Sequence, residues 1–293
     1  MARTIQAELA LEARAELAEG PVWDDRAGCL WWVDIMRGEV HRFDPTTGED
    51  RSRQIGQPVG AAVPSRAGDL VLAVRDGFAR LDFSTGRVTP IARVDHSKPE
   101  CRMNDGKCDR AGRFWAGTMA IDETPGAGAL YRLDASGCAH VVLRGVTISN
   151  GLDWSLDDRV MYYIDSPTGR VDCFDFDAAS GTLANRRPFV TIPSGQGIPD
   201  GLTVDADGFV WTALWGGGAV HRYASDGSLD TVVRVPASRT TSCAFGGNDC
   251  RELFITTSVM ELSPAERGAE PDAGALFRCR PGPAGVAATF CGI

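Results

Sequence analysis

The sequence predicts an all-β fold, a six-bladed β-propeller, from three observations. A pattern of turn, apolar strand, short gap and second strand repeats six times along the 293 residues. Each repeat holds short alternating segments of β-branched and aromatic residues, separated by Gly, Asp and Asn turns. No 12-residue stretch shows helical periodicity. Since one blade cannot bury both of its faces alone, such repeats stack around a common axis.

The repeats follow one another at the spacing typical of propeller blades. They occupy residues 27–48, 67–86, 111–137, 157–181, 207–227 and 250–282. Equivalent apolar positions lie 40 to 50 residues apart, at Trp31, Val71, Trp115, Met161, Trp211 and Phe254. A β-sandwich, the competing all-β fold, does not explain six similar repeats. We therefore expect one domain over residues 1–293, in which residues 1–15 are available as a strand that closes the last blade.

Two links between paired strands are longer than the others. They are Asp122–Gly128 in the third repeat and Glu261–Gly274 in the sixth. Insertions of this kind lie on the faces of a propeller, where they form rims or lids over the central channel. Plain surface loops are the alternative interpretation.

Composition excludes several classes of partner. With 39 acidic and 30 basic side chains the net charge is -9, so no basic surface is expected for nucleic acid or an anionic membrane. The longest apolar stretches fall far short of the ~20 residues of a membrane helix. The first 20 residues mix charged and apolar side chains, unlike an export signal. Nine cysteines without a CxxC pair indicate reduced, buried thiols and a cytoplasmic protein.

Four polar positions recur in the turns that lead into a repeat: Glu19, Asn104, Asn150 and Asp200. Each is followed by glycine at once or after one residue. The innermost strands of a propeller start near its axis, so residues distant in sequence meet there. We expect two carboxylates and two amides to converge at the mouth of the channel.

Such a cluster offers only oxygen donors, which suit calcium, magnesium or manganese better than a thiolate-seeking metal. Taken singly, each residue also fits a turn former, because Asp-Gly and Asn-Gly are favoured turn dipeptides. Apolar residues bracket Asn150 and Asp200, however, unlike the polar surroundings of Asp226-Gly227. A carboxylate among apolar neighbours needs a cation or hydrogen bonds to stay charged.

Other catalytic schemes have little support in the sequence. His41 and His221 occupy equivalent positions in two repeats and are interpreted as structural, and His96 and His140 have no companion motif. No GxSxG elbow and no GxxxxGK[ST] loop occurs, which argues against a serine hydrolase of that type and against phosphate chemistry.

Several motifs together resemble one known family. These motifs are LAEGPVW, NDGKCDRAGRFWAGTM, ISNGLDWS, IPDGL and TSCAFGG, between about residues 17 and 279. They are similar to the senescence marker protein, gluconolactonase and luciferin-regenerating enzyme family. The resemblance implies a six-bladed propeller with one divalent cation in its channel and hydrolysis of aldonolactones.

The resemblance also implies roles for single residues. The metal ligands would be Glu19, Asn150 and Asp200, while Asn104 would face metal and substrate. Arg102 would bind sugar hydroxyls or the ring oxygen. Animal members carry Met-Ala-Glu-Glu where this chain reads Met119-Ala120-Ile121-Asp122, so the substrate-contacting glutamate would be the shorter Asp122, with a changed sugar preference.

The resulting hypothesis is metal-dependent hydrolysis of sugar lactones such as gluconolactone or xylonolactone. Asp200 would take a proton from water and return it to the ring oxygen, while Arg102, Asn104 and Asp122 orient the substrate. The cofactor would be one divalent ion: calcium, magnesium, manganese, zinc or iron. The expected partner is a small sugar lactone, with no nucleic acid or membrane, for a monomer or weak homo-oligomer. Hydrolysis of phosphotriesters or aryl esters, and a non-catalytic calcium-binding propeller, are the alternatives.

Overall fold

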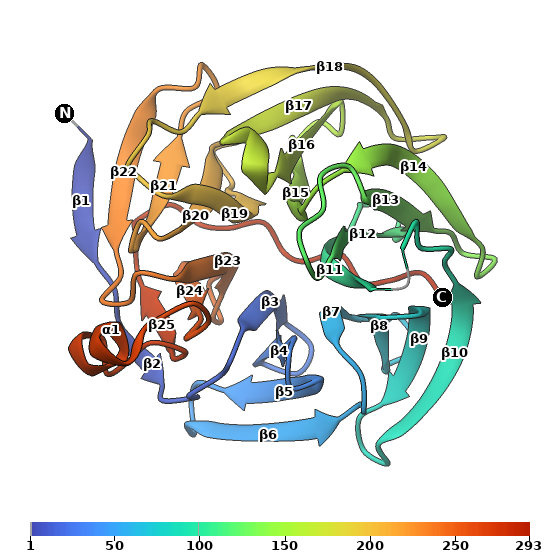
Figure 1. The fold of residues 1–293 in the computed structure, drawn as a ribbon, viewed down its shortest axis with the longest axis horizontal. Helices are drawn as coiled ribbons and strands as arrows, with labels where there is room; N and C mark the ends of the chain where they lie inside the picture. The colour runs from blue at the N-terminus through green and yellow to red at the C-terminus, as the bar shows by residue number, and fades with distance from the viewer. Residues whose placement is uncertain (1, 99) are drawn as a thin grey trace.

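A computed structural model describes residues 2–98 and 100–293 as six sheets arranged in a ring (Figure 1). The predicted six-bladed β-propeller is confirmed. The described residues contain one α-helix, α1 (Pro264–Ala269), and one 3-10 helix, η1 (Ser166–Thr168). No helix in this part of the chain is long and apolar enough to cross a membrane.

Each blade is an antiparallel meander whose first strand is innermost (Figure 1). The first blade consists of β3 (Ala18–Asp24), β4 (Cys29–Asp34), β5 (Glu39–Asp44) and β6 (Glu49–Gln54). The second consists of β7 (Val59–Pro64), β8 (Leu70–Val74), β9 (Gly77–Asp82) and β10 (Arg87–Arg93). The third consists of β11 (Cys101–Cys108), β12 (Phe114–Ala120), β13 (Gly128–Leu133) and β14 (Ala139–Val146).

The remaining blades follow the same order. The fourth consists of β15 (Ser149–Trp154), β16 (Val160–Asp165), β17 (Arg170–Asp177) and β18 (Thr182–Thr191). The fifth consists of β19 (Ile198–Val204), β20 (Val210–Trp215), β21 (Ala219–Tyr223) and β22 (Leu229–Arg234). The sixth consists of β23 (Thr240–Gly246), β24 (Glu252–Thr257) and β25 (Leu276–Cys279).

The N-terminal segment completes the last two blades. β2 (Glu8–Leu11) pairs antiparallel with β25 and is the outer strand of the sixth blade. β1 (Arg3–Gln6) pairs parallel with β22 and adds a fifth strand to the fifth blade. The N-terminal strand β2 therefore pairs with β25 from late in the sequence, and the hydrogen bonds between these two strands close the ring.

The core lies between neighbouring blades, because each sheet packs its faces against the next. Between the third and fourth blades, Trp115 packs edge-on against Trp154 at 5.8 Å, and both belong to one buried cluster with Tyr163 and Phe176. The innermost strands β3, β7, β11 and β23 are almost wholly buried, whereas outer strands such as β6 and β10 alternate exposed and half-buried residues. This packing fixes the inner strands that surround the axis.

The C-terminal segment 282–293 has no strand of its own and crosses the ring (red in Figure 1). Ala206 N donates to Ala284 O at 2.9 Å, Cys291 N to Pro64 O at 2.8 Å and Gly292 N to Gly112 O at 2.9 Å. These contacts join the fifth, second and third blades at the ends of their inner strands. The tail therefore covers one end of the channel and leaves the other end to the predicted site.

Candidate functional site

A cavity of about 200 Å³ opens at the end of the axis where the inner strands begin. Its floor holds five of the residues predicted from the sequence, each only 4% to 6% exposed: Glu19, Arg102, Asn104, Asn150 and Asp200. They come from β3, β11, β15 and β19, so four different blades contribute. The structure thus brings these side chains into one site.

A break in strand pairing occurs at the same place in all four of these inner strands. The register shifts between Glu19 and Val22, Met103 and Gly106, Ser149 and Leu152, and Pro199 and Leu202. Each irregular stretch contains the polar residue and a glycine, as β-bulges that redirect a side chain often do. A Cβ on Gly151 would lie 2.7 Å from Asp200 O. Glycine there allows β15 and β19 to approach closely enough to share the site.

Ser166 fixes the orientation of the Asn150 amide. Asn150 Nδ2 donates to Ser166 Oγ at 3.0 Å, and Ser166 Oγ donates to Pro199 O at 2.8 Å. Because the amide nitrogen is engaged there, the Asn150 oxygen is held on the other side of the side chain. Asn150 Oδ1 is buried and has no hydrogen-bond partner among the described residues, and the same is true of Asp200 Oδ1.

Asn104 is arranged differently from Asn150. Its Oδ1 accepts a hydrogen bond from Arg102 Nη1 at 2.6 Å, and its Nδ2 donates to Ser149 O at 2.8 Å. Arg102 Nη1 also donates to Met103 O at 3.0 Å. Asn104 therefore holds the guanidinium in place, which leaves Arg102 as the cationic group of the cavity floor.

Negative charge dominates the electrostatics of the floor. Burial raises the pKa of Glu19 well above its usual value, and the charges of Asp200 and Asp105 raise it further. Burial, followed by the charge of Asp105, likewise raises the pKa of Asp200. Burial raises the pKa of Asp105 to about 6 and lowers that of Arg102 to about 10. Arg102 thus faces the two buried carboxyl groups of the floor, Glu19 and Asp200, an arrangement that a cation stabilises.

The donor set fits a divalent cation. Two buried oxygens without donors, on Asn150 and Asp200, lie in the same cavity as the Glu19 carboxylate. Among the described residues no group of three His, Cys, Asp or Glu side chains has the arrangement of a metal site. The candidate ligands here are two carboxylates, Glu19 and Asp200, and one amide, Asn150. Oxygen ligands of this kind suit hard cations.

The resemblance assigns a substrate contact to Asp122, which is not among the described residues that line the cavity. Its carboxylate is exposed and accepts a hydrogen bond from Lys98 Nζ at 2.7 Å. Glu123 lines the cavity instead, in a left-handed backbone conformation with φ of 54°. Glu261, from the other long link, also lines it, with φ of 59°. Both long links therefore contribute a carboxylate to the mouth.

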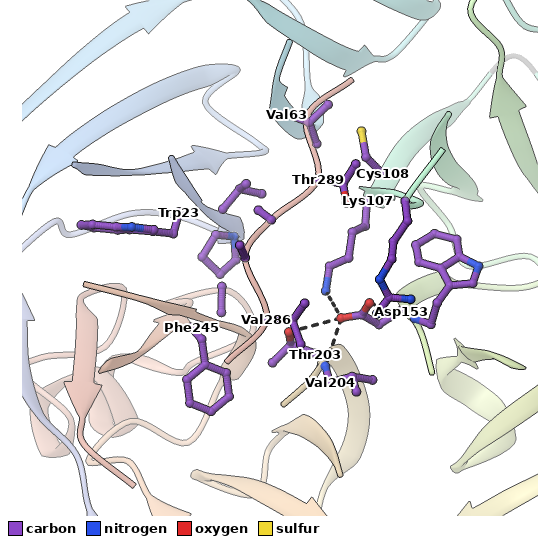
Figure 2. A pocket seen from close by; sticks show the side chains of 17 residues that line it. Trp23, Val63, Lys107, Cys108, Asp153, Thr203, Val204, Phe245, Val286 and Thr289 are labelled. Atoms are coloured by element: carbon purple, nitrogen blue, oxygen red, sulfur yellow. Dashed lines mark hydrogen bonds and ion pairs between the residues drawn. The ribbon is translucent and has the colours of Figure 1, made fainter. Parts of the chain in front are cut away.

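The opposite end of the channel is closed by paired groups. A smaller cavity of about 70 Å³ lies there, bordered by Val286 and Thr289 of the C-terminal segment (Figure 2). Lys107 Nζ donates to Asp153 Oδ2 at 2.8 Å, and Val204 N donates to the same oxygen at 3.0 Å (Figure 2). The charged groups of this smaller cavity therefore neutralise each other. The buried acceptors without donors lie in the larger cavity, so the candidate site is the end of the channel where the inner strands begin.

Comparison with known proteins decides the family. The model described as "SMP-30/Gluconolactonase/LRE-like region" matches residues 17–259. The chain belongs to this family. The resemblance inferred from the sequence motifs is confirmed, and the four inner strands that carry the floor begin within the matched region.

Relatives of this family cover nearly the whole chain. The chain is 40% identical over 281 residues to regucalcin from Danio rerio, covering 94% of each chain. It is 36% identical over 274 residues to the putative sugar lactone lactonase YvrE of Bacillus subtilis, covering 93% of this chain and 94% of the relative. A crystal structure of a calcium-binding protein, regucalcin, from Agrobacterium tumefaciens superposes with a TM-score of 0.95 at 28% identity, covering both chains completely.

Two site residues were missed by reasoning from the sequence. Ser166 accepts a hydrogen bond from Asn150, which lies 16 positions away in the sequence, and no sequence motif includes Ser166. Glu123 follows Asp122 in the long link that was predicted to form a rim of the channel. The length of this link indicated the segment but not which of its residues would line the cavity.

Proposed function

We propose that this protein hydrolyses sugar lactones to aldonic acids, with one divalent cation held by Glu19, Asn150 and Asp200. The observation that carries the proposal is the pair of buried, unpaired oxygens on Asn150 and Asp200 beside a third oxygen donor. The lactonase name of the Bacillus subtilis relative and the family membership support the reaction class. The oxygen-only donors favour calcium, magnesium or manganese over zinc or iron.

Hydrolysis of a lactone adds water to the carbonyl carbon and breaks the bond to the ring oxygen. A bound cation supplies polarisation of the carbonyl and a lower pKa for water. The Asp200 carboxylate takes the proton from the attacking water and returns it to the departing ring oxygen.

The polar floor orients the substrate. Arg102, held by Asn104, donates hydrogen bonds to hydroxyl or ring oxygens of the sugar. Glu123 takes the role expected of Asp122 and accepts a hydroxyl hydrogen bond at the mouth. Holding the ring in one orientation lowers the entropic part of the barrier.

The test uses gluconolactone and xylonolactone with chelator-treated protein, before and after return of calcium, magnesium, manganese or zinc. We expect acid release, measured by pH-stat, to return only with a cation, and to fall by at least 100-fold in Asp200→Asn. Equal rates in treated, reloaded and mutant protein would reject the proposal. Tight cation binding without turnover of any lactone would instead favour a calcium-binding propeller, the class named for the Agrobacterium tumefaciens structure.

We also propose that the protein acts in a reducing cytoplasm, as a monomer or weak homo-oligomer. All nine cysteines lie in the described part of the chain and are unpaired there, as in reducing compartments. The net charge of -9 disfavours nucleic acid and anionic membranes as partners.

A further inference from the structure

The candidate cavity has two chemically different sides. The floor is polar, but the wall and mouth carry six apolar side chains: Leu17, Met119, Ile148, Ile198, Trp215 and Met260. Ile198 remains 48% exposed although it lines the cavity. Ile148, Trp215 and Met260 are half-buried, whereas Leu17 and Met119 are buried. Four apolar side chains that stay partly exposed around one polar site indicate a binding surface.

The apolar wall is built into the strands that carry the floor. Ile198 opens β19, two residues before Asp200, and pairs across the ladder with Trp215 of β20. The Trp215 ring lies beneath the Arg239 guanidinium at 5.3 Å and packs, as Met260 does, against the buried cluster that includes Leu17. These residues therefore hold fixed positions relative to the catalytic carboxylate.

The hydroxyl groups of a sugar gain little from this wall. Each hydroxyl taken from water needs a hydrogen-bond partner, and these six side chains offer none apart from the indole N–H. An alkyl group, by contrast, gains from contact with them in proportion to the apolar area removed from water.

We propose that the site prefers lactones with an apolar substituent, whose ring lies on the polar floor while an alkyl group packs against Ile198, Trp215 and their neighbours. The hydrolytic part of this inference rests on the proposed function. The binding part does not, because it depends only on the shape and chemistry of the wall.

The test compares two pairs of probes that differ by a butyl group. Each methylene moved from water to apolar contact is worth about fourfold in an equilibrium constant, so a butyl group half covered by the wall gives about 16-fold. We expect metal-loaded protein to bind 6-butylpiperidin-2-one, a slowly hydrolysed lactam, about 16-fold more tightly than piperidin-2-one in calorimetry. The kcat/KM for δ-nonalactone is expected to exceed that for δ-valerolactone by a similar factor.

Two variants locate the alkyl group. Ile198→Ser is expected to lower the butyl preference by at least threefold, and its exposed position makes a large loss of stability unexpected. Leu156→Ser is the matched control, since Leu156 is similarly exposed at 46% but lies in the turn after β15, at the opposite end of that strand from Asn150. Its butyl preference is expected to equal that of the original protein.

The outcomes separate the two proposals. A butyl preference near one, or a preference that Ile198→Ser leaves unchanged, overturns the inference even if gluconolactone is hydrolysed. The inference is supported if the protein prefers the butyl lactam and Ile198→Ser reduces this preference. If the same protein hydrolyses no lactone, only the proposed reaction is rejected.

Discussion

Replacing Ser166 by alanine tests how the side chains of the proposed cation site are oriented. The change removes the acceptor of Asn150 Nδ2 and the donor to Pro199 O, and both groups are buried. Without this contact the Asn150 amide can rotate. The orientation with its oxygen toward the cavity then loses the stabilisation of about one net hydrogen bond, roughly 1 kcal/mol, which corresponds to a fivefold loss of cation affinity. Residues behind metal ligands typically contribute about 10- to 100-fold. We therefore expect Ser166→Ala to weaken binding of calcium or manganese by about 5- to 50-fold.

Calorimetric titration of chelator-treated protein measures this effect directly. Ser166→Thr, which keeps a hydroxyl, is expected to restore much of the affinity. Thr257→Val is the matched control, because it removes a buried hydroxyl that donates to Ala275 O in the sixth blade, away from Asn150. It is expected to cost about 1 kcal/mol of stability without changing cation affinity. An unchanged affinity in folded Ser166→Ala would refute the assigned role of Ser166.

Three further predictions follow from the fold and its charges. The raised pKa values of Glu19 and Asp200 mean that protons compete with a cation, so affinity is expected to keep rising with pH above the range in which an ordinary carboxyl group titrates; an affinity in calorimetry that is constant there would contradict this. Burial lowers the pKa of His221 to about 4, so between about pH 4 and 6.5 the unfolded chain binds the extra proton and stability rises with pH. In urea unfolding His221→Gln is expected to flatten that slope, and an unaltered slope would show that other groups cause it. Gly151→Ala places a methyl against the backbone of β19 and is expected to cost about 2 kcal/mol and to weaken cation binding, whereas an unchanged melting temperature would show that the strands can separate.

The fold could be predicted from local sequence patterns because a propeller repeats one unit, the four-stranded blade. Alternating apolar residues such as those around Trp115 and Trp211 identify strands, and the constant spacing identifies blades. Glu19, Asn150 and Asp200 could be recognised as one set for the same reason, because they occupy equivalent bulges beside a glycine.

What the sequence did not reveal depends on loops and on contacts between blades. Ser166 meets Asn150 only because the chain turns at η1 after β16 and returns beside the start of β19. Glu123 rather than Asp122 enters the cavity because the backbone turns through a left-handed conformation there. The apolar wall is assembled from several blades, so its members, such as Met119 and Met260, have no shared pattern along the chain.

The pairing of β2 with β25 has a consequence for biosynthesis. The contact between Glu8 and Arg278 joins residues 270 positions apart, so β2, the outer strand of the sixth sheet, has no partner until almost the entire polypeptide has been synthesised. At roughly 5–20 residues per second, β2 waits about 15 to 50 s for β25. During that interval the nascent chain presents an unpaired β edge, the kind of surface that chaperones protect.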